Sequence, residues 1–380
     1  MKKKINFHEP YLTGTELNYI KDVFKIKKFY GNGKYTLKCE KAIAKKISDK
    51  KVLLTDSCTS ALEMSALIIK KTKNDEVIIP SYTFTSTAAA FIRAGFKVRF
   101  VDVDKSNAMI DPQKIEDKIN KNTRAVVVVH YAGFAAQIKK IQKICNKHKL
   151  RLVEDAAQGF NCFLGNKSLG TFGEFGCFSF HETKNIHAGL SGALVLKNPT
   201  DYKKAIYIRD RGTNRIDMLQ KLKKNYSWVE IGGSFYPTEL QSAFLYAQLK
   251  YVDENTRKRK KLFNRYINNL KDLLISDKIF YTANIINFNS NFHAMCIFLK
   301  SKKIREELRK YLIKKNIQTT SHYFPLHASK VGKNLGYKKS DFPNTNMVSD
   351  TILRLPLHNN IRDYEVDYIC QEIKSFFNNR

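Results

Sequence analysis

The chain has 380 residues, of which 43% are hydrophobic and 12% aromatic, which excludes a disordered segment and predicts a large buried core. Its longest nearly apolar run, residues 125–136, is too short to cross a bilayer, so membrane insertion is not expected. The formal net charge of +32 would suit a nucleic-acid binder. However, the lysines are spread along the whole chain, without a zinc-finger or RNP-type pattern. We therefore expect them to lie on solvated helix faces, and we expect no nucleic-acid partner.

Residues 13–25 and 34–47 are predicted helices, separated by a glycine turn at 31–33. A brief strand at 52–54 comes next, followed by a helix start rich in hydroxyl groups, with Ser57, Thr59 and Ser60. The unpaired N–H groups and the positive dipole end of such a start bind anions. Ordinary capping by serine or threonine is the alternative explanation.

Strands and helices then alternate along the chain. Strands are expected at 76–80, 97–103, 125–130 and 151–154, with helices at 88–94 and 139–149. The run at 125–130 is the kind of continuous apolar stretch that forms a strand buried on both faces of a parallel sheet. The alternation therefore predicts an α/β domain with a mostly parallel sheet, in which ligands collect beyond the carboxyl ends of the strands.

The second half of the chain begins with the stretch 176–185, a short apolar strand that ends in a polar turn carrying Lys184. Further along we expect an antiparallel strand at 192–196, a helix at 203–210 that breaks at 211–215, and one long helix from Pro237 through 249 towards Leu270. Short strands at 294–299 and 317–320 alternate with helices at 304–314 and 363–377, as in a small α+β domain. The predicted domains are 1–255 and 256–380.

Seven cysteines are scattered without a CxxC motif or any other paired spacing. Cys58, Cys162 and Cys177 lie beside segments expected to be core or site, where cysteine often acts as a small hydrophobic residue. This pattern favours free thiols in a reducing cytoplasm, and no metal site is predicted.

An acid and a lysine, each just past a strand, suit a cofactor with a ring nitrogen and an aldehyde, namely pyridoxal 5′-phosphate (PLP). The amine of Lys184 would bind the aldehyde, and Asp155 would keep the pyridine nitrogen protonated. Gln158 would donate to the ring oxygen, and Phe84 or Tyr82 would cover the ring. Taken singly, each residue has an ordinary explanation: a surface lysine, a helix N-cap, a core aromatic.

Several fragments in order carry a family resemblance: Ser57–Glu63, Pro80–Phe84, Glu154–Gln158, Gly176–Asn185, Gly232–Ala243 and His322–His327. Together they resemble the nucleotide-sugar aminotransferases of the DegT/DnrJ/EryC1/StrS family. This resemblance implies PLP fold type I, with a large domain built on a mostly parallel seven-stranded sheet and a small α+β C-terminal domain. It also implies a homodimer with its sites at the subunit interface.

Within the family, the segments 179–185, 211–215 and 322–327 are most similar to the subgroup that makes dTDP-4-amino-4,6-dideoxygalactose. The implied activity moves an amino group from L-glutamate to dTDP-4-keto-6-deoxyglucose, in two half-reactions, for lipopolysaccharide, O-antigen or common-antigen biosynthesis. A 3-keto sugar, a UDP- or GDP-linked ketosugar and a non-catalytic regulatory role are the alternatives. A related 3-dehydratase has histidine where this chain has Lys184, so the lysine favours transamination.

The resemblance also assigns roles to single residues. Lys184 is the implied Schiff-base lysine, Asp155 the pyridinium partner, Gln158 the contact to the ring hydroxyl and Phe84 the stacking aromatic. The implied phosphate ligands are Ser57, Cys58, Thr59 and Ser179, together with Ser234, which aligns with an asparagine that relatives contribute from the neighbouring subunit. The weaker candidates for substrate binding are Tyr82, His187, Arg211, Arg215 and His322.

One loop departs from the family pattern. Relatives follow the lysine with a run like Gly-Glu-Gly-Gly, whereas this chain has Gly189-Leu190-Ser191-Gly192. Glycine permits backbone shapes that serine does not, and Leu190 replaces an acid. We therefore expect the local loop to differ, with consequences for substrate choice more than for PLP chemistry.

Overall fold

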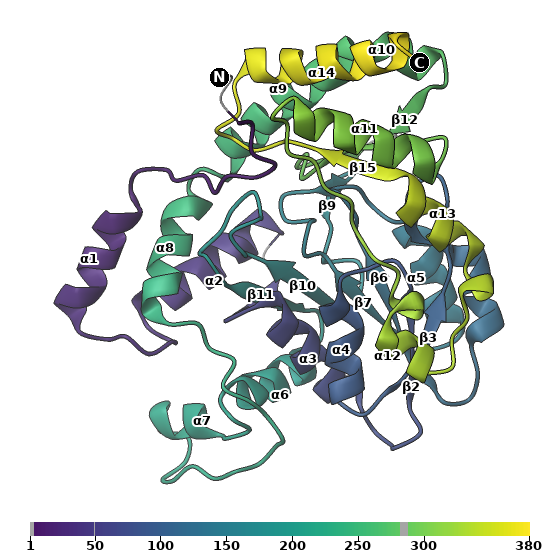
Figure 1. Ribbon diagram of the computed structural model, residues 1–380. Coiled ribbons are helices and arrows are strands. Elements are labelled where there is room, and N and C mark those ends of the chain that lie inside the picture. Colours follow the sequence, from purple (N-terminus) through teal and green to yellow (C-terminus); the bar gives the residue numbers. More distant parts are fainter. Residues whose placement is uncertain (1–3, 49, 282–287) are drawn as a thin grey trace.

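The computed structural model describes residues 4–48, 50–281 and 288–380 (Figure 1). Its central element is a seven-stranded sheet in the order β1-β11-β10-β7-β6-β2-β3. Among these seven strands, β11 is antiparallel to both neighbours, and the other pairs are parallel. This confirms the predicted mostly parallel sheet. The strands are β1 (Lys51–Thr55), β2 (Glu76–Pro80), β3 (Lys97–Val101), β6 (Thr123–Val129), β7 (Arg151–Asp155), β10 (Phe175–Ser179) and β11 (Gly192–Leu196).

Helices cover both faces of this sheet, which is why central strands such as β6 and β10 are mostly apolar and buried, whereas the edge strand β3 exposes Lys97 and Arg99. In β6, Ala125 and Val127 pack on one face while Val126 and Val128 pack on the other. The first face is covered by α3 (Cys58–Ile69), α4 (Thr85–Arg93) and α6 (Pro199–Arg209). The opposite face is covered by α2 (Lys34–Lys46), α5 (Ile138–Lys147) and α8 (Glu239–Leu249).

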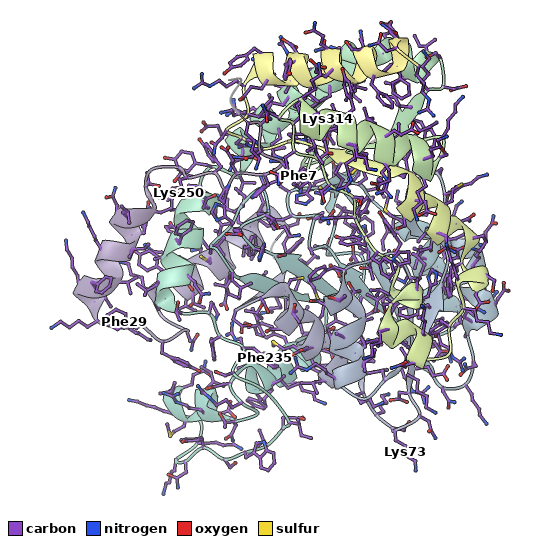
Figure 2. The ribbon with its side chains drawn as sticks, in the orientation of Figure 1. Phe7, Phe29, Lys73, Phe235, Lys250 and Lys314 are labelled. Carbon is purple, nitrogen blue, oxygen red and sulfur yellow. The ribbon has the colours of Figure 1, made fainter. Side chains whose placement is uncertain are left out.

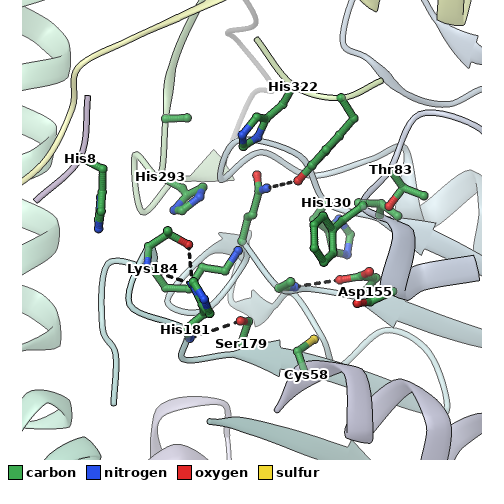
Figure 3. A pocket seen from close by; sticks show the side chains of 18 of the residues that line it. His8, Cys58, Thr83, His130, Asp155, Ser179, His181, Lys184, His293 and His322 are labelled. Carbon is green, nitrogen blue, oxygen red and sulfur yellow. Dashed lines mark hydrogen bonds between the residues drawn. The ribbon is translucent and has the colours of Figure 1, made fainter. Parts of the chain in front are cut away.

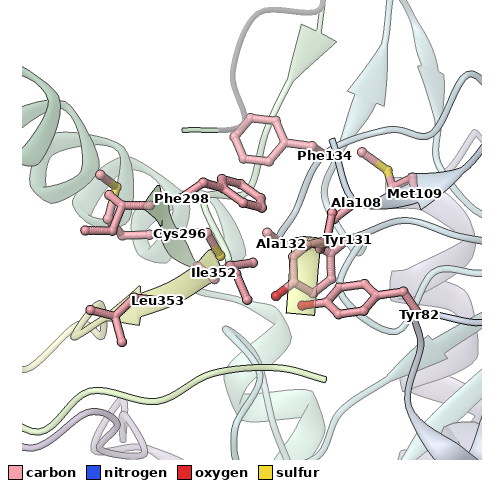
Figure 4. Packing of buried hydrophobic residues seen from close by; sticks show 14 of the residues in the cluster. Tyr82, Ala108, Met109, Tyr131, Ala132, Phe134, Cys296, Phe298, Ile352 and Leu353 are labelled. Carbon is pink, nitrogen blue, oxygen red and sulfur yellow. The ribbon is translucent and has the colours of Figure 1, made fainter. Parts of the chain in front are cut away.

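The carboxyl-terminal part forms a smaller unit on a three-stranded antiparallel sheet in the order β12-β14-β15. Its core is continuous with that of the large sheet, and Figure 4 shows Tyr82 and Tyr131 next to Cys296 and Ile352. The elements of this unit are α9 (Val252–Asn269), α10 (Lys271–Ile275), β12 (Ile279–Tyr281), β14 (Met295–Leu299), α11 (Lys302–Lys314), α13 (Pro343–Thr351), β15 (Ile352–Leu355) and α14 (Asp363–Asn378). The short helix α12 (Lys330–Asn334) lies instead beside the large sheet, where the hydroxyl of the following Tyr337 donates to the Val98 carbonyl of β3 at 2.6 Å. The division of domains at 255/256 stays a prediction.

Shorter elements complete the described chain. These are α1 (Glu16–Ile26), α7 (Arg215–Leu219), the pairs β4 (Val103–Asp104) with β5 (Met109–Ile110) and β8 (Phe163–Leu164) with β9 (Lys167–Ser168), and β13 (Phe288–Asn289). Four 3₁₀ turns lie at Pro112–Lys114, Glu116–Lys118, Leu326–Ala328 and Lys339–Asp341. Within the described residues, no helix combines the length and apolarity needed to span a membrane.

Two predicted elements are wrong. The long helix from Pro237 towards Leu270 is two helices, because the amides of Lys250 and Tyr251 bond to carbonyls three residues back and end α8. The expected strand at 317–320 makes only isolated bridges, Ile317 to Ile5 and Thr320 to Arg354. Its place in the sheet is taken by β15, which follows α13 directly and has no counterpart among the predicted strands.

Candidate active site

A cavity of about 440 Å³ opens beyond the carboxyl ends of β6, β7 and β10, with residues of the small unit on its far side (Figure 3). Asp155 ends β7 and Ser179 ends β10, while Lys184 follows in the turn after β10. Cys58 and Thr59 reach the cavity from the start of α3. The parallel topology thus brings together residues that are far apart in the sequence.

Lys184 is held in a tight turn in which its amide donates to the carbonyl of His181 at 2.8 Å. The side chain is only partly accessible, through the cavity, and burial lowers the pKa of its amine to about 8. The nearby Arg354 guanidinium lowers this pKa further, whereas Cys58 and Asp155 oppose the shift. A lysine in this setting is deprotonated far more readily than a surface lysine, as a nucleophile for an aldehyde requires.

Asp155 presents a fixed carboxylate at the floor of the cavity. Its Oδ2 accepts from the Thr87 hydroxyl at 2.7 Å, and its Oδ1 accepts from the Ala157 amide at 3.1 Å. Burial raises the pKa of this carboxyl, while those two hydrogen bonds and Lys184 act in the opposite direction. A protonated ring nitrogen placed against this carboxylate would supply the positive charge that a buried acid needs to stay ionised.

The start of α3 forms a cradle for an anion. Ser57 is the N-cap, and its hydroxyl accepts from the Ser60 amide at 3.1 Å, so the capping explanation holds for this side chain. The amides of Cys58 and Thr59 belong to the first turn, where helices bind anions. Gly192 lies directly beneath, and a Cβ there would come within 2.4 Å of the Cys58 nitrogen. These donors fit the phosphate of PLP.

Gln158 and Phe84 occupy the positions between these groups. The Gln158 Oε1 accepts from the Ala132 amide at 2.6 Å, and its Nε2 donates to the Tyr323 hydroxyl at 2.8 Å, which leaves one amide N–H for a ring oxygen. Phe84 is the N-cap residue of α4, lines the cavity and is 58% exposed. Both positions suit the roles that the resemblance implies.

Other predicted residues lie elsewhere. Tyr82 is buried behind the cavity wall, where it packs edge-on against Tyr131 and Tyr323. His187 contacts the Tyr11 carbonyl at 3.0 Å. The remaining predicted residues, Arg211, Arg215 and Ser234, lie on the segment 210–235, which does not line the cavity within the described residues. The expected role of Ser234 is in a neighbouring subunit, so a single chain does not test it.

The loop after Lys184 accepts its unusual residues without strain. The residue of this loop with a left-handed backbone is Gly189, whose φ is +72°. Ser191 does not have a positive φ, so its side chain causes no backbone strain. Ser191 is fully buried, and its hydroxyl donates to the Thr55 carbonyl at 3.0 Å. Leu190 lines the cavity and is partly exposed. Leu190, which stands where relatives carry an acid, thus forms part of the cavity wall, and the expected difference of the loop from its relatives stays a prediction.

Three residues in the far wall of the cavity, Arg259, His293 and Arg354, have no local signal in the sequence. Arg259 belongs to the basic run 257–261, whose pattern is typical of a solvated helix face. It is nevertheless buried, and its guanidinium donates to the carbonyls of Phe292 and His293 at 2.9 and 2.7 Å. His322, a weak candidate from the sequence, does line the cavity.

The model of the DegT/DnrJ/EryC1/StrS aminotransferase family matches residues 10–374. The protein MJ1066 of Methanocaldococcus jannaschii is 30% identical over 376 residues, covering 96% of this chain and 95% of that protein. GDP-perosamine synthase of Vibrio cholerae is 26% identical, with 98% and 99% covered. The structure of Helicobacter pylori PseC, an aminotransferase involved in the biosynthesis of pseudoaminic acid, superposes with a TM-score of 0.91 at 25% identity, with 100% of both chains covered.

Proposed function

This chain belongs to the DegT/DnrJ/EryC1/StrS aminotransferase family, and we propose that it moves an amino group from L-glutamate to a nucleotide-linked 4-keto-6-deoxy sugar. It is an aminotransferase of PLP-dependent fold type I, and its cofactor is PLP. The acceptor that we propose is dTDP-4-keto-6-deoxyglucose, which would give dTDP-4-amino-4,6-dideoxygalactose for a surface polysaccharide.

One observation carries this proposal: Lys184, Asp155 and the first turn of α3 all face a single cavity, and burial lowers the pKa of the lysine to about 8. When bound, PLP links to an amine nitrogen, takes up the electron pair left by proton loss at the neighbouring carbon, and stores the amino group between two substrates. The cavity presents one matching group for each part of this cofactor: an amine, a carboxylate and helix-terminal amides.

Each of these residues has a separate role, which follows from its position in the cavity. Asp155 would hold a proton on the ring nitrogen of bound PLP, which would let the ring accept electrons. The amides of Cys58 and Thr59 would hold the phosphate of the cofactor and so help to orient it. Lys184 Nζ, once free, removes the proton from the α-carbon of glutamate and later delivers a proton to the sugar carbon that receives the amine. The partly closed cavity limits access of water to this proton transfer.

The acceptor is supported by the fragments 179–185, 211–215 and 322–327. A GDP-linked acceptor is the second candidate, because the similar Vibrio cholerae protein is a GDP-perosamine synthase. Incubating the protein with glutamate and a panel of dTDP-, UDP- and GDP-linked ketosugars, with NMR of the products, separates the two. A dTDP-4-amino sugar as main product is expected, and exclusive use of another nucleotide would replace the proposed acceptor.

We also propose that the protein works as a homodimer in the cytoplasm. A homodimer would allow Ser234 to reach the phosphate in the neighbouring subunit, as the family resemblance implies. All seven cysteines are buried free thiols, a state that a reducing compartment preserves.

A further inference from the structure

Histidines are concentrated in the cavity wall, which five of the nine in the chain help to form. Two of them use their rings to contact other side chains. His130 Nε2 lies 2.9 Å from Glu154 Oε2, and His322 lies against the guanidinium of Arg354. Unlike these two, His293 keeps one ring nitrogen without a partner among the described residues.

The backbone around His293 is held in place from two sides. The residue lies just before β14 and is 6% exposed. Its carbonyl accepts from the Arg259 guanidinium at 2.7 Å, and the amide of the next residue, Ala294, donates to the Ala132 carbonyl at 3.3 Å. These bonds tie His293 both to α9 and to the loop that follows β6 in the large sheet.

Hydrogen bonds fix which ring nitrogen of His293 carries the proton. The side-chain amide of Asn185 donates through Nδ2 to the Asn291 carbonyl at 2.7 Å, so its Oδ1 is the acceptor that faces the ring. His293 Nδ1 lies 3.1 Å from this Oδ1 and is therefore the donor. Burial, followed by the charge of Lys184, lowers the pKa of the imidazole well below its usual value, so the ring is neutral. A neutral ring with its proton on Nδ1 has a bare lone pair on Nε2.

This lone pair lies near the reacting centre. Figure 3 shows His293 next to Lys184 and across the cavity from Asp155 and His130. Lys184 and His293 also line a second hollow of about 20 Å³, which has room for about one water molecule. Two residues that share so small a hollow lie close together. His293 therefore borders the place where a substrate carbon must sit to exchange a proton with Lys184.

The Nε2 of His293 requires a donor from the ligand, because a buried acceptor left without one costs free energy. The amine of Lys184 does not fill this role, since it is committed to the cofactor and to the proton transfer. Glutamate offers no donor either, because its amino group is committed to the cofactor and its two carboxylates only accept. A 4-keto-6-deoxy sugar does offer one, the hydroxyl on C3, which is bonded to the carbon next to the keto carbon.

We propose that His293 Nε2 accepts a hydrogen bond from the C3 hydroxyl of the bound 4-ketosugar, and so makes the second half-reaction selective for sugars that carry this hydroxyl. The proposal rests on the proposed function, since it names a contact for the acceptor in the same cavity. This contact turns the keto carbon towards the amine of Lys184. The glutamate half-reaction does not depend on it.

The test compares dTDP-4-keto-6-deoxyglucose with its 3-deoxy analogue, dTDP-4-keto-3,6-dideoxyglucose, which lacks the C3 hydroxyl. Protein first charged with the amino group by glutamate gives kcat/KM for each sugar. Calorimetry with PLP-loaded protein, which has no amino group to transfer, gives the Kd of each sugar without turnover.

His293→Asn keeps a donor near the position of Nδ1, and so the bond to Asn185, but removes the acceptor at Nε2. It should lower kcat/KM and raise Kd for the 3-hydroxy sugar roughly 10-fold. Both values for the 3-deoxy sugar, and the rate of the glutamate half-reaction, should stay at the wild-type level. His293→Gln, which places an amide oxygen near the position of Nε2, should recover most of the loss.

His358→Asn is the matched control, because His358 is a buried histidine whose Nε2 contacts the Asn6 carbonyl at 3.2 Å and which does not line the cavity within the described residues. It should leave the ratio between the two sugars unchanged. A wild-type protein that binds and converts both sugars equally well, or a His293→Asn protein that loses equally with both, overturns the proposal. A charged wild-type protein that aminates no ketosugar would instead overturn the proposed function.

Discussion

Lys184 is one of 67 lysine and arginine residues, and its environment sets it apart from the rest. Most lysines lie at the surface, as Lys73, Lys250 and Lys314 do in Figure 2. Lys184 instead points into a cavity whose walls exclude much of the water that would stabilise an ammonium group. Its chemistry follows from that placement.

The rate at which cofactor-free protein binds PLP covalently should rise with pH, with a midpoint near the pKa of Lys184. That pKa is lowered to about 8, so the amine is protonated and unreactive below this pH and neutral and nucleophilic above it. Rapid-mixing absorbance measured across this pH range gives the midpoint. A midpoint of about 10, as for an ordinary lysine, would contradict the environment described here.

Asp155→Asn should keep the fold and lose activity. The amide oxygen can still accept from the Ala157 amide or the Thr87 hydroxyl, but the side chain no longer carries the charge that holds a proton on the ring nitrogen. We expect the rate of the glutamate half-reaction to fall on the order of 100-fold, with thermal unfolding nearly unchanged. An equal rate in the variant would show that Asp155 does not face the ring nitrogen.

The sequence predicts some of these residues and not others, for a physical reason. Lys184, Asp155 and Gln158 follow closely on apolar strands, and the ends of parallel strands meet at one edge of a sheet. Arg354 lies in a short strand near the carboxyl end of the chain, and no neighbour in the sequence marks it as part of the cavity. Arg259 could not be picked out from the sequence, because it belongs to the basic run 257–261, in which the other basic residues are all exposed.

The contact between β11 and α3 sets the shape of the anion cradle. Gly192, at the start of β11, allows the backbone of Ser57 and Cys58 to approach closely. Thr55, paired with Gly192, ends β1 just before the helix begins. The start of β11 and the start of α3 thus hold each other in position. The phosphate site depends on that contact.

Gly192→Ala should weaken PLP binding at least about tenfold and destabilise the fold by about 1–3 kcal/mol, because the new Cβ would lie 2.4 Å from the Cys58 nitrogen and displace the helix start. Gly336→Ala is the control. That glycine has φ +88°, so its substitution also strains the backbone, but an added Cβ would meet nothing within 4 Å, and the residue lies away from the cavity. Fluorescence titration with PLP measures the affinity of both variants for the cofactor. Equal PLP affinities of the two variants would disprove the dependence of the phosphate site on the contact between β11 and α3.

Elements with a strong apolar pattern are predicted nearly to the residue, as at 76–80 and 192–196, because burial on both faces leaves little alternative. The break between α8 and α9 has no such signal, because its residues, Lys250 and Tyr251, include neither proline nor glycine. The bridge of Ile317 to Ile5 pairs segments from opposite ends of the chain, so no local pattern could indicate it.

The molecule as a whole places the cavity between the large sheet and the small unit. Phe7, from the amino-terminal segment, lies at the junction of the two (Figure 2) and contacts Arg354. The segment 210–235 extends away from this junction and exposes large apolar side chains, among them Leu222 (71%), Trp228 (76%) and Ile231 (71%). Surfaces of this kind commonly bind another protein surface.

We expect the protein to sediment at twice the mass of one chain. Trp228→Glu should shift it towards monomer and reduce activity, because the segment that carries Ser234 would no longer be held against a second copy. Tyr364→Glu is the matched control, since Tyr364 is an exposed aromatic residue on α14, in the small unit. Analytical ultracentrifugation separates the outcomes, and an active wild-type monomer would rule out a shared site.

The most direct test of the whole account is a single-turnover reaction of PLP-loaded protein with L-glutamate, followed by absorbance and by assay of the 2-oxoglutarate formed. We predict that the visible band of the lysine-bound cofactor is lost, that one 2-oxoglutarate forms per site, and that Lys184→Ala shows neither change. Bound PLP that stays unchanged with glutamate, or equal conversion in Lys184→Ala, would contradict the account.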